Sequence, residues 1–213
     1  FQEYKPFLGM LKSPWTGLKN FEYFLLDSNF WRVLKNTLEI NILQIVAGFP
    51  VPIIFALFLN ELWSVRFKKT VQTVSYLPHF ISWVVAAGIT TSLLSPSTGA
   101  VNLFLKNVMG IEPIHFMAKK EYFRAIVILT NIWKTFGMNA VYYLAALSSI
   151  DTQLYEAASM DGASKLRQTW NITLPGIKTM AIVMLVLQVG SLVTFGFEQI
   201  FLLYNPLVYE VGD

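Results

Sequence analysis

The sequence predicts an all-α fold, a polytopic membrane helix bundle. Of the 213 residues, 54% are hydrophobic and only 14% are charged, whereas soluble domains carry about 25% charged residues. Several stretches are long and apolar enough to cross a hydrocarbon core about 30 Å thick, which takes about 20 residues of helix. Polar connectors separate these stretches. Lipid is therefore the expected solvent for much of the chain.

Four stretches qualify as membrane spans, namely 38–59, 71–94, 122–147 and 177–197. The first contains Pro50 and Pro52 and the second contains Pro78, so we expect kinks at these positions. A soluble bundle of amphipathic helices is the alternative, but such helices need charged outer faces. The first, second and fourth stretches offer almost no charge for such faces.

The segments outside the spans define the rest of the domain organisation. Residues 1–37 are rich in aromatic side chains that suit a membrane interface, and residues 38–209 form the expected transmembrane domain. Lys and Arg number six on the side of connectors 60–70 and 148–176 and six on the other side. The positive-inside rule therefore leaves the orientation open. The chain does not begin with Met and shows no signal-peptide pattern, so we expect a piece of a longer protein.

Several kinds of chemistry need residues that the sequence lacks. It has no Cys, which excludes disulfides, thiolate metal sites and Cys nucleophiles. Its net charge of +3 comes from scattered basic residues, unlike a nucleic-acid-binding surface, and His115 has no ligand-spaced companion for a metal. Hydrolase, zinc-protease and P-loop patterns are absent. We therefore expect no catalytic residue, metal or cofactor on this chain, and no ATP bound by it.

The longest hydrophilic connector, residues 148–176, carries a spaced motif. It reads Glu156-Ala157-Ala158, three residues, Gly162, nine residues, Ile172, one residue and Leu174-Pro175. Asp151 or Thr152 can cap a short helix before this motif. Gly162 can adopt a positive φ and redirect the chain. We expect a second short helix over 163–173, followed by Pro175 in the first turn of the next helix.

This motif matches the EAA–x3–G–x9–I–x–LP signature of ABC-importer permeases at every defining position. The rest of the chain resembles the carbohydrate (maltose-transporter, MalF-like) class, polysaccharide permease LplB-like subfamily. The matching segments are 15–21, 30–31, 36–37, 67–73, 76–83, 94–99 and 200–206. The resemblance implies the ABC importer type I permease fold. Members typically have six spans, so this fragment would lack the first and last of them.

The resemblance also implies a mechanism and a set of partners. The connector 148–176 would be cytoplasmic, whereas residues 1–30 and 95–121 would lie outside the cell. The partners would be a second permease subunit in a heterodimer, a cytoplasmic ATPase dimer that binds ATP, and an extracellular solute-binding lipoprotein at a bacterial plasma membrane. The residues docking on the ATPase would be Glu156, Ala157, Ala158, Asp161, Gly162, Ile172, Leu174 and Pro175.

This identification predicts the import of oligosaccharides or polysaccharide breakdown products. Two alternatives remain, a permease for a non-sugar solute and an ion-coupled carrier. The carrier agrees with the composition but gives no account of residues 156–175.

Polar residues inside a span are costly and are therefore functional candidates. Asn131, Lys134, Thr135 and Tyr142 fall within an arc of about 100° on one helix face. This stripe can line a substrate path. Alternatively, Lys134 pairs with an acidic residue, or the stripe packs helices together through hydrogen bonds. His79 is similarly open to two roles, a proton relay or a hydrogen-bonded position at a helix break.

Overall fold

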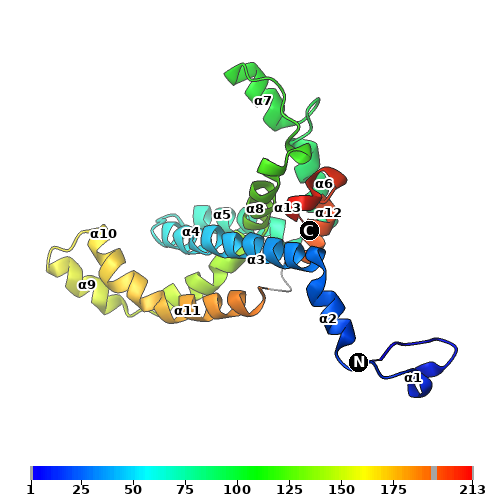
Figure 1. The fold of residues 1–213 in the computed structure, drawn as a ribbon. Helices are drawn as coiled ribbons and strands as arrows, with labels where there is room; N and C mark the ends of the chain where they lie inside the picture. Colours follow the sequence, from blue (N-terminus) through cyan, green and yellow to red (C-terminus); the bar gives the residue numbers. More distant parts are fainter. Residues whose placement is uncertain (1, 193–195, 213) are drawn as a thin grey trace.

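The computed structural model describes residues 2–192 and 196–212, and these contain no β-strand, which confirms the all-α prediction. Figure 1 shows a group of long helices from which α1, α2 and α7 project. The α-helices are α1 (Gly9–Lys12), α2 (Lys19–Leu26), α3 (Ser28–Gly48), α4 (Pro50–Asn60), α5 (Val65–Phe80), α6 (Trp83–Leu93), α7 (Ala100–Met109), α8 (Lys120–Ser148), α9 (Thr152–Met160), α10 (Lys165–Gln168), α11 (Leu174–Gly190), α12 (Phe197–Leu203) and α13 (Tyr209–Gly212). Phe116–Ala118 and Pro206–Val208 form 3-10 turns.

The first span is longer than the apolar run that predicted it. Helix α3 begins at Ser28 because the Asp27 side chain caps it, accepting a hydrogen bond from the Asn29 N–H at 2.9 Å. Phe49 keeps helical angles of φ −61° and ψ −42°, so α3 passes directly into α4. Pro50 stands at the start of α4, where a missing N–H costs least. Two described segments, Ser28–Asn60 and Lys165–Gly190, are long and apolar enough to cross a membrane.

The second span consists of two helices, and its break lies later than the sequence suggested. Pro78 lies inside α5, which continues to Phe80. The chain becomes extended at Ile81, and Ser82 caps α6 by accepting a hydrogen bond from the Val85 N–H at 3.3 Å. The cap at Ser82 therefore decides where the new helix begins.

Helix α8 is the centre of the packing, and it contacts α3, α4, α5 and α11. Helices α8 and α5 approach closely at Gly137, where an added Cβ would lie 2.0 Å from the Ser75 carbonyl oxygen of α5. Towards the C-terminal end of α8, its residues Ala140, Tyr143 and Leu147 form a buried cluster with residues of α4 and α11. A second cluster, which includes Phe123 and Val127, lies near the start of α8.

Polar contacts fasten the other end of the bundle. Arg124 on α8 donates to Asn36 Oδ1 at 2.9 Å and pairs with Glu39 Oε2 at 2.7 Å. Lys120 donates a hydrogen bond to Glu210, and this bond with the Lys120 charge lowers the pKa of the Glu210 carboxyl. Asn102 of α7 is buried and makes four side-chain hydrogen bonds, to Leu94, Ser95 and twice to Ile114. These bonds fix α7 to the end of α6.

The fourth span starts earlier than expected. Residues 169–173 form a π-helical segment that joins α10 to α11, so one helix runs from Lys165 to Gly190. The predicted span 177–197 includes residues 193–195, which lie outside the described residues. Much of the α11 surface is apolar and exposed, for example Val186 at 64% and Leu187 at 62%. Such a surface suits lipid or a second membrane subunit.

Candidate functional site

The connector 148–176, which we call the signature loop, is the first candidate site. The Asp151 side chain caps α9, because its Oδ1 accepts a hydrogen bond from the Gln153 N–H at 2.9 Å. Helix α9 then carries Glu156, Ala157 and Ala158 and ends at Met160. This part follows the geometry expected from the sequence.

Gly162 turns the chain after α9. Its φ is +76°, in the left-handed region that favours glycine. The Gly162 N–H bonds the Ser159 carbonyl at 3.1 Å, and the Ala163 N–H bonds the Ala158 carbonyl at 2.9 Å. This pair of bonds is a Schellman motif, which satisfies the last carbonyl groups of α9. The expected positive φ is therefore confirmed.

Side-chain hydrogen bonds hold the two arms of the turn together. Gln168 is buried, and its Nε2 donates to Ser159 Oγ and to the Ala163 carbonyl, both at 3.0 Å. Tyr155 and Thr173 share a hydrogen bond of 3.0 Å between their hydroxyl groups. The turn is therefore a preformed unit with its own buried polar contacts.

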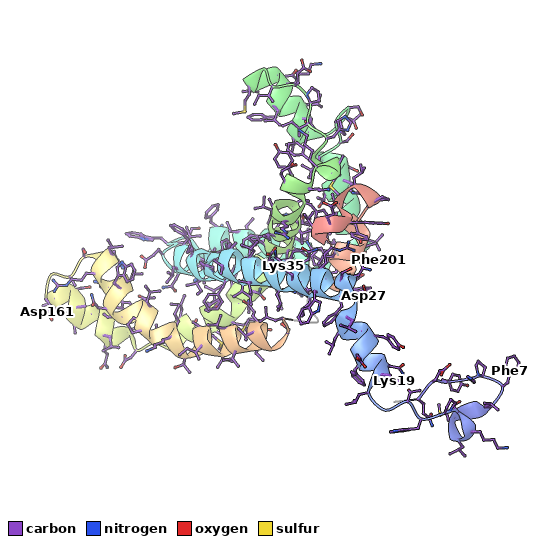
Figure 2. The ribbon with its side chains drawn as sticks, in the orientation of Figure 1. Phe7, Lys19, Asp27, Lys35, Asp161 and Phe201 are labelled. Atoms are coloured by element: carbon purple, nitrogen blue, oxygen red, sulfur yellow. The ribbon has the colours of Figure 1, made fainter. Side chains whose placement is uncertain are left out.

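The outer surface of the turn is open. Glu156, Ala157, Asp161 and Gly162 are all exposed, and Figure 2 shows Asp161 at the tip that projects from the bundle. Large apolar side chains surround them, with Met160 at 90% exposure and Leu166 at 69%. An exposed apolar and acidic surface of this kind fits a protein partner.

The second half of the signature has a different place in the fold. Ala158 and Ile172 are half-buried, and Leu174 is half-buried against the cluster that Ala140 and Tyr143 help to form. Pro175 stands in the first turn of α11, as expected. The sequence prediction assigned all eight residues of the signature to docking on the ATPase. The structure divides them into an exposed group around Gly162 and a group near Leu174 that ties the loop to the core.

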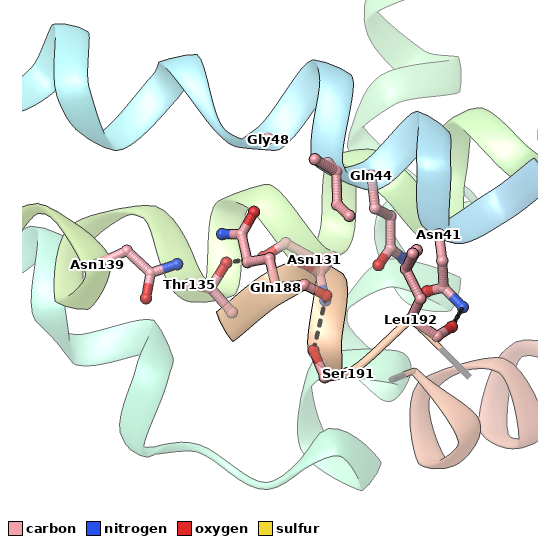
Figure 3. Close-up of a pocket in the computed structure, with 10 residues that line it drawn as sticks. Asn41, Gln44, Gly48, Asn131, Thr135, Asn139, Gln188, Ser191 and Leu192 are labelled. Atoms are coloured by element: carbon pink, nitrogen blue, oxygen red, sulfur yellow. Dashed lines mark hydrogen bonds between the residues drawn. The ribbon is translucent and has the colours of Figure 1, made fainter. Parts of the chain in front are cut away.

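The second candidate site is a cavity between α3, α8 and α11, which we call the amide cavity (Figure 3). Its polar lining consists of Asn41, Gln44, Asn131, Thr135, Asn139, Gln188 and Ser191. It offers about 50 Å³ to water-sized molecules, which is room for a few waters and not for a sugar ring.

Several polar atoms of the amide cavity have no partner among the described residues. They are Asn41 Oδ1, Gln188 Oε1 and both polar atoms of the Gln44 side chain. A buried amide without a hydrogen bond costs about 1–3 kcal/mol. Asn41 uses its nitrogen to donate to the Leu192 carbonyl at 2.7 Å, which leaves the oxygen turned to the cavity. The cavity therefore offers both hydrogen-bond donors and acceptors that have no partner among the described residues.

The predicted stripe on α8 is divided in two. Asn131 and Thr135 line the amide cavity, and Asn131 also donates to Gln199 Oε1 at 3.3 Å. Lys134 points elsewhere, because it donates to the His79 carbonyl at 2.9 Å and lies 5.1 Å from the centre of the Trp83 ring. Tyr142 is 45% exposed and lies outside the cavity lining. The His79 backbone thus holds Lys134 where α5 ends.

Sequence reasoning assigned no role in the substrate path to the cavity residues on the other helices. Asn41 and Gln44 share a face of α3, whereas Glu39 is paired with Arg124 and Lys35. Gln188 was missed although it interrupts the apolar run 180–190. That interruption is the signal that could have found it, since an amide within a span is costly.

Comparison with known proteins places the chain in a family. The profile of the binding-protein-dependent transport system inner membrane component matches residues 48–211. The chain is 46% identical over 213 residues to the polygalacturonan/rhamnogalacturonan transport system permease protein YteP of Bacillus subtilis, covering 100% of this chain and 66% of YteP. It is 40% identical over 213 residues to protein LplB of Bacillus subtilis, covering 100% of this chain and 67% of LplB. It thus spans about two thirds of the length of these relatives.

Solved structures agree with these sequence relatives. A crystal structure of a bacterial ABC transporter involved in the import of the acidic polysaccharide alginate contains a chain that matches with a TM-score of 0.90 and 44% identity. The match covers 94% of this chain and 70% of that one. The resemblance to carbohydrate ABC permeases is confirmed. The family profile covers well over half of the chain, so the chain belongs to the binding-protein-dependent transport system inner membrane components.

Proposed function

We propose that this chain is the permease subunit of an ATP-driven importer for oligosaccharides released from polysaccharides. The observation that carries the proposal is the signature loop, a preformed turn with Glu156, Ala157 and Gly162 on an exposed surface. The chain has no P-loop, so the energy would come from a partner ATPase. That ATPase dimer would dock on the signature loop in the cytoplasm of a bacterium. A second permease subunit and an extracellular solute-binding lipoprotein would complete the importer, and the chain would cross the plasma membrane several times.

The substrate class follows from the relatives. YteP is described as a polygalacturonan/rhamnogalacturonan permease, and the alginate importer has also been solved with an alginate pentasaccharide-bound periplasmic protein. The unpartnered amides of the amide cavity can donate to and accept from hydroxyl groups. Because the cavity holds only a few waters in this conformation, it would have to widen during transport to admit a polyhydroxylated solute. We place Asn131, Thr135 and Gln188 on the substrate path. Lys134 and Tyr142 lie outside the amide cavity and remain candidates for another part of the substrate path.

The test is ATP-driven uptake by the full-length chain, reconstituted with its partner subunits in liposomes. We expect uptake of oligogalacturonides or alginate oligosaccharides that depends on ATP inside and on the solute-binding protein outside. Arabino-oligosaccharides and sn-glycerol 3-phosphate serve as comparison solutes. Uptake of the phosphate ester alone would refute the carbohydrate assignment. Uptake that follows an ion gradient and needs no ATPase subunit would refute the importer.

A substitution at Gln188 tests the amide cavity separately. Replacing Gln188 by Leu removes a buried oxygen that has no described partner, so thermal stability should be unchanged or slightly higher. Uptake should nevertheless fall about tenfold, if a solute hydroxyl normally bonds this amide at a cost of about 1.4 kcal/mol when lost. Asn107→Leu, at an exposed position of α7, is the control and should leave uptake unchanged. Unaltered uptake by Gln188→Leu would remove the residue from the path.

A further inference from the structure

An unusual exposed surface lies on residues 61–69, and we call it the basic collar. These residues form the α4–α5 turn and the first turn of α5. Trp63 is 97% exposed, and Val65 and Phe67 also expose more than half of their side chains. Arg66, Lys68 and Lys69 follow directly. Glu61 is the one carboxylate of this segment, and it lies 3.8 Å from Lys165 of α10. The collar therefore has an excess of positive charge beside exposed aromatic rings.

The direction of these side chains follows from the helix. At 100° per residue, Ser75 lies about 180° around α5 from Arg66 and about 120° from Lys69. The Ser75 side of α5 is the one that packs against Gly137 of α8. Arg66 and Lys69 are therefore turned away from the bundle, and their spacing of three residues puts them on neighbouring surface positions. Both are exposed, whereas Lys68 is half-buried on the packed side.

The depth of the collar also follows from the fold. The apolar helix α4 ends at Asn60, and the next apolar stretch begins at Val71. Residues 61–69 thus lie where the chain leaves and re-enters the hydrocarbon, at the depth of lipid headgroups. The contact between Glu61 and Lys165 puts this turn at the same end of the bundle as the signature loop, as Figure 1 also shows.

We propose that the basic collar binds the headgroups of anionic phospholipids, with Arg66 and Lys69 on the phosphate and Trp63 and Phe67 at the interface. Trp and aromatic rings favour the interfacial zone, and cations next to a membrane helix attract anionic lipid. The proposal rests on the proposed function only for placing this end in the cytoplasm. An acidic surface of the ATPase is the competing occupant, because Trp63 also lines a groove with Glu156 and Met160 of the signature loop. Arg66 and Lys69, which are exposed and turned away from the bundle, favour the lipid.

The experiment titrates brominated phosphatidylglycerol into the purified full-length transporter in zwitterionic lipid and follows tryptophan quenching. The difference between the native protein and Trp63→Phe isolates the Trp63 signal. Each surface cation contributes roughly fivefold to lipid affinity. Arg66→Gln/Lys69→Gln should therefore bind the lipid about 25-fold more weakly. Lys12→Gln/Lys106→Gln removes the same charge from exposed positions distant in sequence from the collar, and it should bind like the native protein.

Three outcomes would overturn the lipid site. The first is native lipid affinity in Arg66→Gln/Lys69→Gln, and the second is an equal loss in the control. The third is a larger loss of ATPase affinity than of lipid affinity in Arg66→Gln/Lys69→Gln, which would assign the collar to the ATPase. Uptake is measured on the same preparation. Intact lipid binding without ATP-driven uptake would refute the proposed function and leave the collar standing.

Discussion

Replacing Gly162 by Pro is expected to weaken binding of the ATPase subunit while the membrane helices stay folded. Proline fixes φ near −65° and has no N–H, whereas Gly162 has φ +76° and its N–H bonds the Ser159 carbonyl. The turn after α9 would have to rearrange, at a cost on the order of 3 kcal/mol. That cost corresponds to a loss of roughly 150-fold in affinity for the ATPase subunit. Co-purification and titration of the ATPase subunit on the full-length chain measure it.

A second glycine provides a matched control. Gly110 ends α7 with φ +67°, and its N–H bonds the Lys106 carbonyl at 3.2 Å. Both glycines are exposed and have no heavy atom within 4 Å of an added Cβ. Gly110→Pro should impose the same local strain and leave ATPase affinity unchanged. The docking proposal would be wrong if Gly162→Pro bound the ATPase and drove uptake like the native chain.

Replacing Gly137 by Ala is expected to be the most destabilising single-carbon change in the described packing. The added Cβ would lie 2.0 Å from the Ser75 oxygen and 2.5 Å from the Ser75 carbonyl carbon. Backbone atoms cannot swing aside as a side-chain tip can, so α5 must move away from α8. Overpacking of this kind costs about 1–3 kcal/mol, or roughly 2–12 °C in the unfolding midpoint. Scanning fluorimetry of the full-length chain in detergent measures the shift.

Gly88 of α6 is the control for this change. It is also a helical glycine, but an added Cβ there meets nothing within 4 Å. Gly88→Ala should be neutral or stabilise the helix by up to about 1 kcal/mol. Equal midpoints for the two alanine variants would mean that α5 and α8 do not approach as closely as described.

The sequence predicted what local residue chemistry decides. Asp151 as a cap, Gly162 as a left-handed turn and Pro175 in the first turn of a helix all depend on a few neighbouring residues, and all three agree with the structure. The break after α5 was placed too early, because Pro78 is tolerated near a helix end while Ser82 supplies the next cap. The capping residue Ser82 was therefore a better indicator of the helix boundary than Pro78.

The sequence did not predict contacts between distant helices. Gln188 and Asn41 line the same cavity because α3 and α11 both pack against α8, and no periodicity within one helix reports this. The stripe on α8 had the correct face for Asn131 and Thr135. The same pattern could not show that Lys134 lies outside the cavity. The partner of Lys134 is the His79 carbonyl, which is available because α5 ends beside it. Pairing with an acidic side chain had been the expected alternative for this lysine.

The uninterrupted helix from Lys165 to Gly190 has a mechanical consequence. Its 26 residues make a lever of about 39 Å at 1.5 Å per residue, with the signature loop at one end and Gln188 of the amide cavity at the other. A movement of the loop would therefore be carried toward the cavity along the backbone of one continuous helix, which includes the π-helical residues 169–173. The π-helical stretch near the loop end is the place where such a lever can change its winding. One stretch of helix thus connects the signature loop to the amide cavity.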